Sequence, residues 1–326
     1  MTVEAIVFAD SEITHHDDIE EAKAAHGTTW VRATEADEQE MLAVAAAFEI
    51  HPLTVEDLIN DVRPKTEEFR KYTFVLVKTA RLRKGETTFS EEIRDIPVGV
   101  YMGDDWVVTL STGKIKAIDN TWEAVLREDE RLLQQGPDFT AYRVIDGIVD
   151  GYFDVLDQLE DQIEAIEDEV TSSTNIDTLE AINAVRRDLL SFRKLAWPSR
   201  EAIGLLARGD PTQIQQPTEK YYRDVYDHIV QVVDLIETYR DLATGARDIY
   251  LNVLSQSTND VMKTLTVVAT IVLPLTLVTG LYGMNITGSA LNMPELAWPY
   301  AYPAVLFGMF LMTLILVVYF HERSFL

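Results

Sequence analysis

Two long apolar runs near the C-terminus dominate the pattern of hydrophobic and polar positions. The first, 19 residues from Thr264 to Tyr282, contains no charged side chain, and the second, from Leu296 to Phe320, is also free of charge. At a rise of about 1.5 Å per residue, each run is long enough as a helix to cross the roughly 30 Å hydrocarbon core of a bilayer. We therefore predict two transmembrane helices at 264–285 and 300–320, joined by a loop at 286–299 and followed by a tail at 321–326.

A heptad pattern precedes the first run. Apolar residues alternate steps of three and four, which is typical of a helix seam, at Tyr222, Val225, Ile229, Val232, Ile236, Tyr239, Ala243, Ala246, Tyr250 and Val253. No proline interrupts this pattern before Pro274. One helix of about 65 residues, roughly 100 Å long, is therefore predicted to contain both a cytoplasmic stalk at 216–263 and the first transmembrane segment.

A second line of positions on this helix has the same spacing of three and four residues, but the types of residue change along it. It is polar in the stalk and small or apolar in the membrane, and it consists of Asp241, Gly245, Asp248, Asn252, Ser255, Asn259, Met262, Thr266, Ala269, Leu273, Thr276, Gly280 and Gly283. If several copies of the helix surround an axis, this line would line a pore, with narrow hydrophobic rings at Met262 and Leu273. The alternative is a solvated face in the stalk and an ordinary small-residue packing surface in the membrane.

The chain before residue 139 has the pattern of an α/β domain. β-Branched and aromatic residues with partial alternation predict strands at 2–8, 28–32, 72–82, 88–101 and 105–111. Helical patterns lie at 35–48, 52–60 and 114–135. Residues 1–138 are therefore predicted to form a cytoplasmic α/β domain.

Residues 139–215 are predicted to form an antiparallel pair of acidic helices. Apolar residues recur at helical spacing from Val144 to Val170 and from Leu179 to Phe192, and the pair turns around Thr171–Asn175. Trp197-Pro198 is expected to interrupt the second helix locally. The acidic side is interpreted as a solvated face or, alternatively, as a surface that attracts cations.

The sequence offers little for catalysis. It contains no GxGxxG or GxxxxGK[ST] pattern, no Ser/His/Asp spacing of note and no cysteine. We therefore do not predict an enzyme, and we expect no organic cofactor. His15-His16 has the composition of a metal pair, but beside Asp17 and Asp18 it is interpreted as a solvated turn.

Charge and topology place the chain in a membrane. The net charge of −26, from 54 acidic and 28 basic residues, argues against nucleic-acid binding and fits cation handling, although adaptation to high salt explains it equally well. The N-terminus lacks the pattern of a signal peptide. The loop 286–299 contains no Lys or Arg, whereas Lys263, His321 and Arg323 lie at the other ends of the spans. We expect a multi-pass protein of the cell membrane with both termini in the cytoplasm.

The segment between the two spans carries a family resemblance. Tyr282-Gly283-Met284-Asn285, followed by Met293-Pro294-Glu295-Leu296, resembles the signature of the CorA family of magnesium channels. Between about Trp30 and Tyr319, further matching segments are Asn259–Lys263, Leu273–Thr276, Tyr222–His228, Trp197–Glu201 and Ile50–Asp57. The resemblance implies a funnel-shaped homopentamer in the lipid bilayer, in which the first span lines the pore and the second packs outside it.

The resemblance also implies a selectivity filter at Gly283, Met284 and Asn285. Mg²⁺ gives up its water reluctantly, and neutral amide and carbonyl oxygens can hold the hydrated ion without the tight grip of carboxylates. Glu295 would concentrate cations at the entrance. The pore below would be lined by Asn259, Met262, Thr266, Ala269, Leu273, Thr276 and Gly280. Taken alone, Asn285 would be a helix C-cap and Glu295 an exposed carboxylate.

For gating, the resemblance implies cytoplasmic sites for divalent cations between neighbouring subunits. The matching residues are Asp57 on one subunit and Asp224 on the next, and the further candidates are Glu56, Asp146, His228 and Asp248. Bound Mg²⁺ would bridge carboxylates that otherwise repel each other, and would thereby hold the closed state. Without the resemblance, Asp57 would be an ordinary helix residue, and Asp224 and His228 would be an i,i+4 pair on a solvated face.

The C-terminal tail departs from the family, and two alternatives stay open. In place of a strongly basic tail the chain ends His321-Glu322-Arg323-Ser324-Phe325-Leu326, so a basic ring at the pore entrance would rest on Lys263. One alternative is a Zn²⁺ or Co²⁺/Ni²⁺ transporter of the same architecture, with or without proton coupling, because an outer-sphere filter distinguishes hydrated divalent ions poorly. The other is a non-conducting, membrane-anchored sensor of divalent cations.

Overall fold

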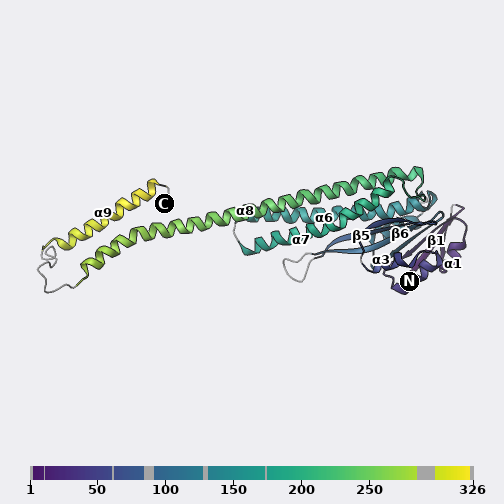
Figure 1. The fold of residues 1–326 in the computed structure, drawn as a ribbon, viewed down its shortest axis with the longest axis horizontal. Coiled ribbons are helices and arrows are strands. Elements are labelled where there is room, and N and C mark those ends of the chain that lie inside the picture. The colour runs from purple at the N-terminus through teal and green to yellow at the C-terminus, as the bar shows by residue number, and fades with distance from the viewer. Residues whose placement is uncertain are drawn as a thin grey trace. The chain divides into compact units, whose positions relative to one another are not determined.

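The computed structural model describes residues 3–10, 12–60, 62–83, 92–127, 131–172, 175–284 and 298–323. It divides into two compact units, Met1–Asp248 and Ile249–Leu326, and the long helix α8 (Gln216–Tyr282) contributes to both. The first unit combines a sheet with short and long helices, whereas the second is helical (Figure 1). An α/β domain, a long stalk helix and C-terminal membrane helices were predicted, and this fold class is confirmed.

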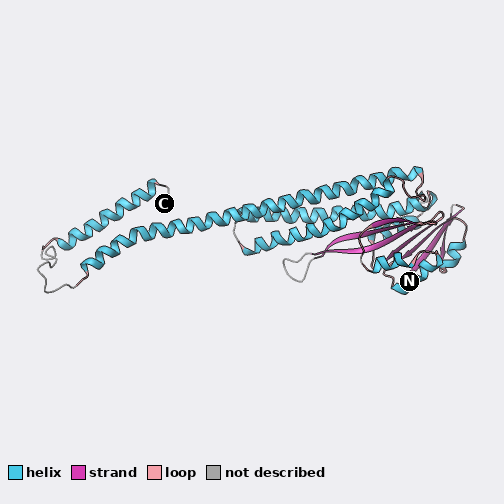
Figure 2. Cartoon of the chain, in the orientation of Figure 1, coloured by secondary structure: helices cyan, strands magenta, loops and turns pink. Residues whose placement is uncertain are grey.

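A seven-stranded mixed sheet forms the base of the first unit (Figure 2). Its spatial order is β2-β1-β3-β7-β6-β5-β4, and only the β3–β7 pair is parallel among the described strand pairs. The strands are β1 (Val3–Ala9), β2 (Glu12–His16), β3 (Thr28–Ala33), β4 (Lys65–Glu68), β5 (Thr73–Arg83), β6 (Glu92–Met102) and β7 (Trp106–Ser111). The long β5–β6 hairpin carries most of the surface on which the helices pack.

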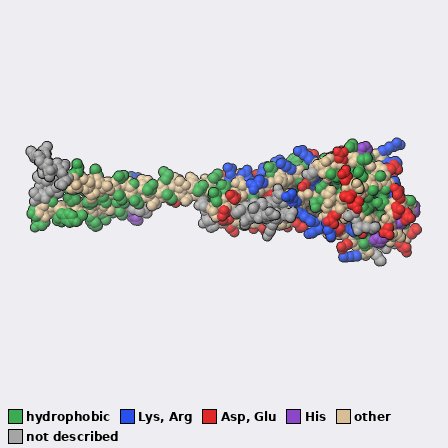
Figure 3. Space-filling model, turned by 90° about the horizontal axis from the view of Figure 1, so that it is seen from below, with side chains coloured by type: hydrophobic (Ala, Val, Ile, Leu, Met, Phe, Trp, Pro, Cys, Tyr) green, Lys and Arg blue, Asp and Glu red, His purple; other side chains and the backbone are tan. Residues whose placement is uncertain are grey.

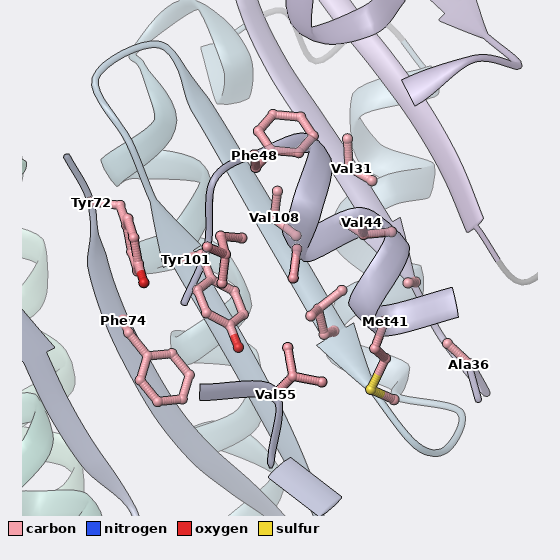
Figure 4. Close-up of a cluster of buried hydrophobic side chains, with 14 of the residues drawn as sticks. Val31, Ala36, Met41, Val44, Phe48, Val55, Tyr72, Phe74, Tyr101 and Val108 are labelled. Carbon is pink, nitrogen blue, oxygen red and sulfur yellow. The ribbon is translucent and has the colours of Figure 1, made fainter. Parts of the chain in front are cut away.

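Short helices enclose one hydrophobic core against this sheet. They are α1 (Ile19–Ala24), α2 (Glu38–Ala47) and α3 (Pro52–Ile59). The short helices α4 (Lys116–Leu126) and α5 (Arg131–Gln134) pack instead against the long helix α6 (Pro137–Ser172). Met41 and Val44 of α2 and Val55 of α3 meet Val31 and Tyr101 of the sheet (Figure 4). The chain begins both helices with local signals: Asp37 and Glu40 form a capping box at α2, and Pro52 occupies the first turn of α3.

Three long helices complete the first unit: α6 (Pro137–Ser172), α7 (Ile176–Ala207) and the first part of α8. On α6, the Tyr152 hydroxyl donates to the carbonyl of Lys78 on β5, which ties this helix to the sheet. Tyr222 and Tyr239 of α8 donate hydrogen bonds to Asp138 and Glu160 of α6. The heptad seam from Tyr222 to Tyr250 is buried, and these contacts show that its first part packs on helix α6 of the same chain.

Three predictions at the edges of the elements were wrong or incomplete. Residues 12–16, interpreted as a turn around His15-His16, form the edge strand β2, because pairing with β1 overrides the polar composition. Strand β4 at 65–68 was not predicted. Helix α7 continues through Pro198 instead of breaking there, because the turns that follow, with Ser199 and Ile203, are buried in the unit.

The second unit contains the end of α8, from Ile249, and α9 (Ala301–Glu322). Both helices are long and apolar enough to cross a membrane. Large apolar side chains such as Leu273 and Phe307 are about two-thirds exposed, at 68% and 66%. The surface of these helices is apolar, while the charged side chains gather over the first unit (Figure 3). A chain that exposes so much apolar surface on helices of this length is suited to a lipid environment.

Candidate ion pathway and cation site

The predicted pore line lies on the surface of α8. The residues predicted to line the pore are all exposed in the single chain, and they are Asn259, Met262, Thr266, Ala269, Leu273, Thr276 and Gly280. The hydroxyls of Thr266 and Thr276 donate to carbonyls one turn earlier, at 2.8 and 2.9 Å. Their protons are therefore used within the helix, and the oxygens keep lone pairs with which to accept hydrogen bonds. Leu265 and Leu277 on other faces are exposed too, so exposure alone does not single out one face as the pore line.

The described part of the signature sits where α8 ends. Gly283 follows the last helical residue and donates its N–H to the Thr279 carbonyl at 2.9 Å. A Cβ at Gly283 would lie 3.0 Å from that same carbonyl oxygen, so a larger residue would strain this helix end. Met284 is exposed. Asn285 and Glu295, predicted as filter and entrance residues, lie outside the described residues.

Two helices of the first unit bring acidic and imidazole groups together. Asp146 and Asp150 occupy successive turns of α6, and His228 lies on α8; their ligand atoms are all within 4.8 Å of one another. His228 Nδ1 is 3.9 Å from Asp150 Oδ1, and this nitrogen is buried without a hydrogen-bond partner among the described residues. The ring of His228 stands edge-on to Phe153, which holds it over α6.

The charges around Asp146 have opposing effects on the pKa of its carboxyl. Asp146 is only 8% exposed, and burial is the largest cause that raises the pKa of its carboxyl, followed by the negative charge of Asp150. Arg143, at 3.1 Å, and His228 oppose this shift, while Asp224 adds to it. A divalent cation would relieve the repulsion, because it neutralises more than one carboxylate at once. The first unit thus contains a carboxylate cluster with a chemical reason to bind cations.

This cluster includes a residue that sequence analysis missed. Asp146, Asp224 and His228 were predicted as regulatory residues, and the structure places them in one electrostatic neighbourhood. Asp150 was not among the residues predicted to bind a cation. Its i,i+4 spacing from Asp146 was the available signal, since residues four apart on a helix are neighbours.

In the second predicted group, Asp57 is already paired with the ammonium group of a lysine. Asp57 Oδ2 is 2.7 Å from Lys65 Nζ, which also lies 2.8 Å from Glu67. Burial works against the charged form of Lys65, but the hydrogen bonds to these two carboxylates outweigh it and raise the pKa of the ammonium. Glu56 is exposed and accepts a hydrogen bond from Asn60. All five of these residues line one cavity of about 390 Å³.

The remaining predicted residues are not joined within one chain. Asp57 lies on α3 and Asp224 on α8, and no hydrogen bond or ion pair connects them in the part of the chain that the structure describes. Asp248 is exposed on α8 at the end of the first unit.

Fold and site together define a membrane protein with two C-terminal spans and an acidic α/β unit that offers cation ligands. Residues 25–322 match the family described as "CorA-like Mg2+ transporter protein", and the chain belongs to this family. The family is one of transporters, in agreement with the expectation that the chain is not an enzyme.

Individual relatives agree with this membership. The chain is 35% identical over 300 residues to the cobalt/magnesium transport protein CorA of Thermotoga maritima, which covers 91% of this chain and 83% of the relative. The protein of the same name from Methanocaldococcus jannaschii is 27% identical over 263 residues, or 80% and 79% of the two chains. The complete structure of the CorA magnesium transporter from the same organism matches with a TM-score of 0.84 at 22% identity, over 100% and 99% of the chains.

Proposed function

We propose that this chain is a divalent-cation channel that carries Mg²⁺, and also Co²⁺, into the cell down the electrochemical gradient. The observation that carries the proposal is the 35% identity to a cobalt/magnesium transport protein over 91% of this chain, together with the family match over residues 25–322, which includes both candidate spans. A charge of +2 moving inward through 100 mV gains about 4.6 kcal/mol, so the membrane potential suffices as a driving force. The working unit is a homopentamer in the cell membrane with both termini in the cytoplasm.

The filter of this channel is the signature Gly283-Met284-Asn285. Five copies of Asn285 present neutral amide oxygens that accept hydrogen bonds from the water shell of Mg²⁺, so the ion passes hydrated and binding stays reversible. Glu295 raises the local cation concentration in front of this ring. The line from Asn259 to Gly280 on α8 forms the pore below it, supported by its 3–4 spacing and by the change from polar to small or apolar residues along it.

The cytoplasmic groups regulate the channel. Mg²⁺ bound at Asp146, Asp150, Asp224 and His228, and at Asp57, Glu56 and Asp248 from a neighbouring subunit, holds the closed state. Carboxylates and water are the ligands that Mg²⁺ prefers, and the cluster on α6 offers two carboxylates within 4.8 Å of each other. When internal Mg²⁺ falls, the uncompensated carboxylates repel, and the open state gains population.

One feature of the cluster favours a second candidate function. His228 contributes a buried imidazole nitrogen, and imidazole suits Zn²⁺, Co²⁺ and Ni²⁺ better than Mg²⁺. A Zn²⁺ or Co²⁺/Ni²⁺ transporter of the same architecture is therefore the second candidate. Competition between Mg²⁺ and each of these ions for influx separates the two. Protein that binds the ions but passes none would instead be a sensor.

The test of the proposal is Mg²⁺ influx into proteoliposomes under an inside-negative potential without a proton gradient. We expect influx through the wild type, loss of at least about tenfold in Asn285→Ala because the hydrated ion loses its ring of acceptors, and unchanged influx in the control Asn120→Ala, an exposed asparagine of the first unit. An intact wild-type oligomer that passes no Mg²⁺ at low internal Mg²⁺ would overturn the proposal.

A further inference from the structure

The charged side chains that line a cavity on the first unit are mostly basic, in contrast to the acidic composition of the whole chain. The chain as a whole has 54 acidic and 28 basic residues, but between residues 186 and 200 it carries five basic residues and one acidic residue. This part of α7 forms one wall of a cavity of about 530 Å³, whose other walls come from β5, β6 and the residues before β4. The size is within the range of small-molecule sites.

The charged side chains of this cavity leave a positive surplus. Arg63, Lys78, Arg193 and Lys194 line it, and Asp95 is the one carboxylate among its lining residues. Asp95 is paired with Lys78 at 2.9 Å. Arg193 bonds Glu237 through Nε at 2.9 Å, which leaves its two terminal amino groups outside this contact. Guanidinium and ammonium groups that converge on one cavity suit phosphate oxygens, which arginine binds with two parallel hydrogen bonds.

A second, independent feature of the cavity points to a ligand with an acceptor atom. Trp197 lines the cavity, and its indole nitrogen is buried without a hydrogen-bond acceptor among the described residues. A buried N–H group without a partner costs free energy, so such groups normally have one. The Arg200 guanidinium lies 4.1 Å from the centre of the indole ring, which fixes the ring in place. The indole N–H thus has no acceptor in the part of the chain that the structure describes.

The walls beside these groups are apolar. Leu190 is about half exposed, and Pro64 and Pro198 complete a surface that polar solvent covers poorly. A ligand that fits both parts has several negative charges at one end and a flat or apolar body at the other. We propose that this cavity binds an organic polyphosphate of the nucleoside triphosphate class, with its phosphates on Arg63, Arg193 and Lys194 and its body against Trp197.

The proposal is tested by binding alone and does not depend on transport. Full-length protein in detergent is titrated calorimetrically with ATP, tripolyphosphate and adenosine as probes, in EDTA so that no divalent cation contributes. We expect saturable ATP binding below about 1 mM, weaker binding of tripolyphosphate and none of adenosine. No ATP binding overturns the proposal. Adenosine binding as tightly as ATP overturns the assignment of the phosphates to the basic side chains, and tripolyphosphate binding as tightly as ATP overturns the assignment of the body to Trp197.

Variants locate the site. Lys194→Gln is expected to weaken ATP binding about tenfold, and Arg63→Gln combined with Lys194→Gln about 100-fold, because each removes charge-assisted hydrogen bonds. Trp197→Phe keeps the ring but loses the N–H, and is expected to weaken binding about threefold or more. The matched control is Arg187→Gln, which removes the same charge from an exposed position of α7 outside the cavity and should leave binding within about twofold. ATP binding that survives the double variant in an intact oligomer overturns the proposal.

Discussion

The carboxylate cluster on α6 leads to a measurable prediction about stability without and with Mg²⁺. Asp146 and Asp150 approach within 4.8 Å. Two unit charges at this distance repel by about 1 kcal/mol in water and about 3.5 kcal/mol at an effective dielectric constant of 20. Because the Asp150 side chain is 61% exposed, the lower figure applies. Asp150→Asn should therefore stabilise the cation-free protein by about 1 kcal/mol.

Mg²⁺ should reverse this order. At ten times its dissociation constant, a site that exists only in the folded protein adds about 1.4 kcal/mol to the free energy of unfolding. The wild type gains this increment, and the variant, which lacks one ligand, gains less. In EDTA the variant should melt about 2 to 4 °C above the wild type, and in saturating Mg²⁺ it should no longer do so.

The assay is thermal unfolding of the full chain in detergent, followed by intrinsic fluorescence at pH 8, where histidine is ordinarily neutral. Glu201→Gln is the control, because it removes one exposed negative charge from α7 at a position with no acidic residue three or four positions away. Equal melting temperatures of Asp150→Asn and wild type in EDTA would refute the reasoning. So would a control that shows the same shift.

Three further predictions concern pH, the Asp57 group and packing. The raised pKa of Asp146 means that the folded protein binds a proton there more tightly than the unfolded chain, so this group's contribution to stability falls as pH rises above the usual carboxyl pKa. At acid pH, protons compete with Mg²⁺ for this carboxylate, so inhibition of influx should require more internal Mg²⁺. An inhibition constant that does not change with pH would contradict this prediction. Lys65→Gln frees Asp57 from its ammonium and should tighten Mg²⁺ inhibition of influx about threefold to tenfold, whereas unchanged inhibition would show that Asp57 is not a ligand. Tyr222→Phe loses the hydrogen bond to the Asp138 carbonyl and should lower the free energy of unfolding in denaturant by about 1 kcal/mol. An unchanged free energy of unfolding would contradict this, since it would mean that water replaces the lost donor without cost.

Local sequence patterns were enough to predict most helices and strands. They failed where hydrogen bonding to another strand determines the secondary structure. The β5 and β7 strands were predicted from their β-branched residues, and α2 and α3 from their helical periodicity. Strand β2 was missed because its polar sequence becomes a strand only by hydrogen bonding to β1. Helix α7 passes Pro198 because burial of the following turns outweighs the lost backbone hydrogen bond.

Charge-free length, heptad spacing and the Gly283-Met284-Asn285 signature are all local in the chain, so the candidate spans, the long helix and the family could be predicted from the sequence. Which acidic residues lie together depends instead on packing. Asp146 and His228 are 82 positions apart in the chain, and the packing of α8 on α6 brings their ligand atoms within 4.8 Å. Packing likewise decided that Asp57 is paired with Lys65, and that Trp197 lines a basic cavity in an acidic protein. Ligand sites depend on distances between elements, and those distances are set by packing, which no single stretch of sequence contains.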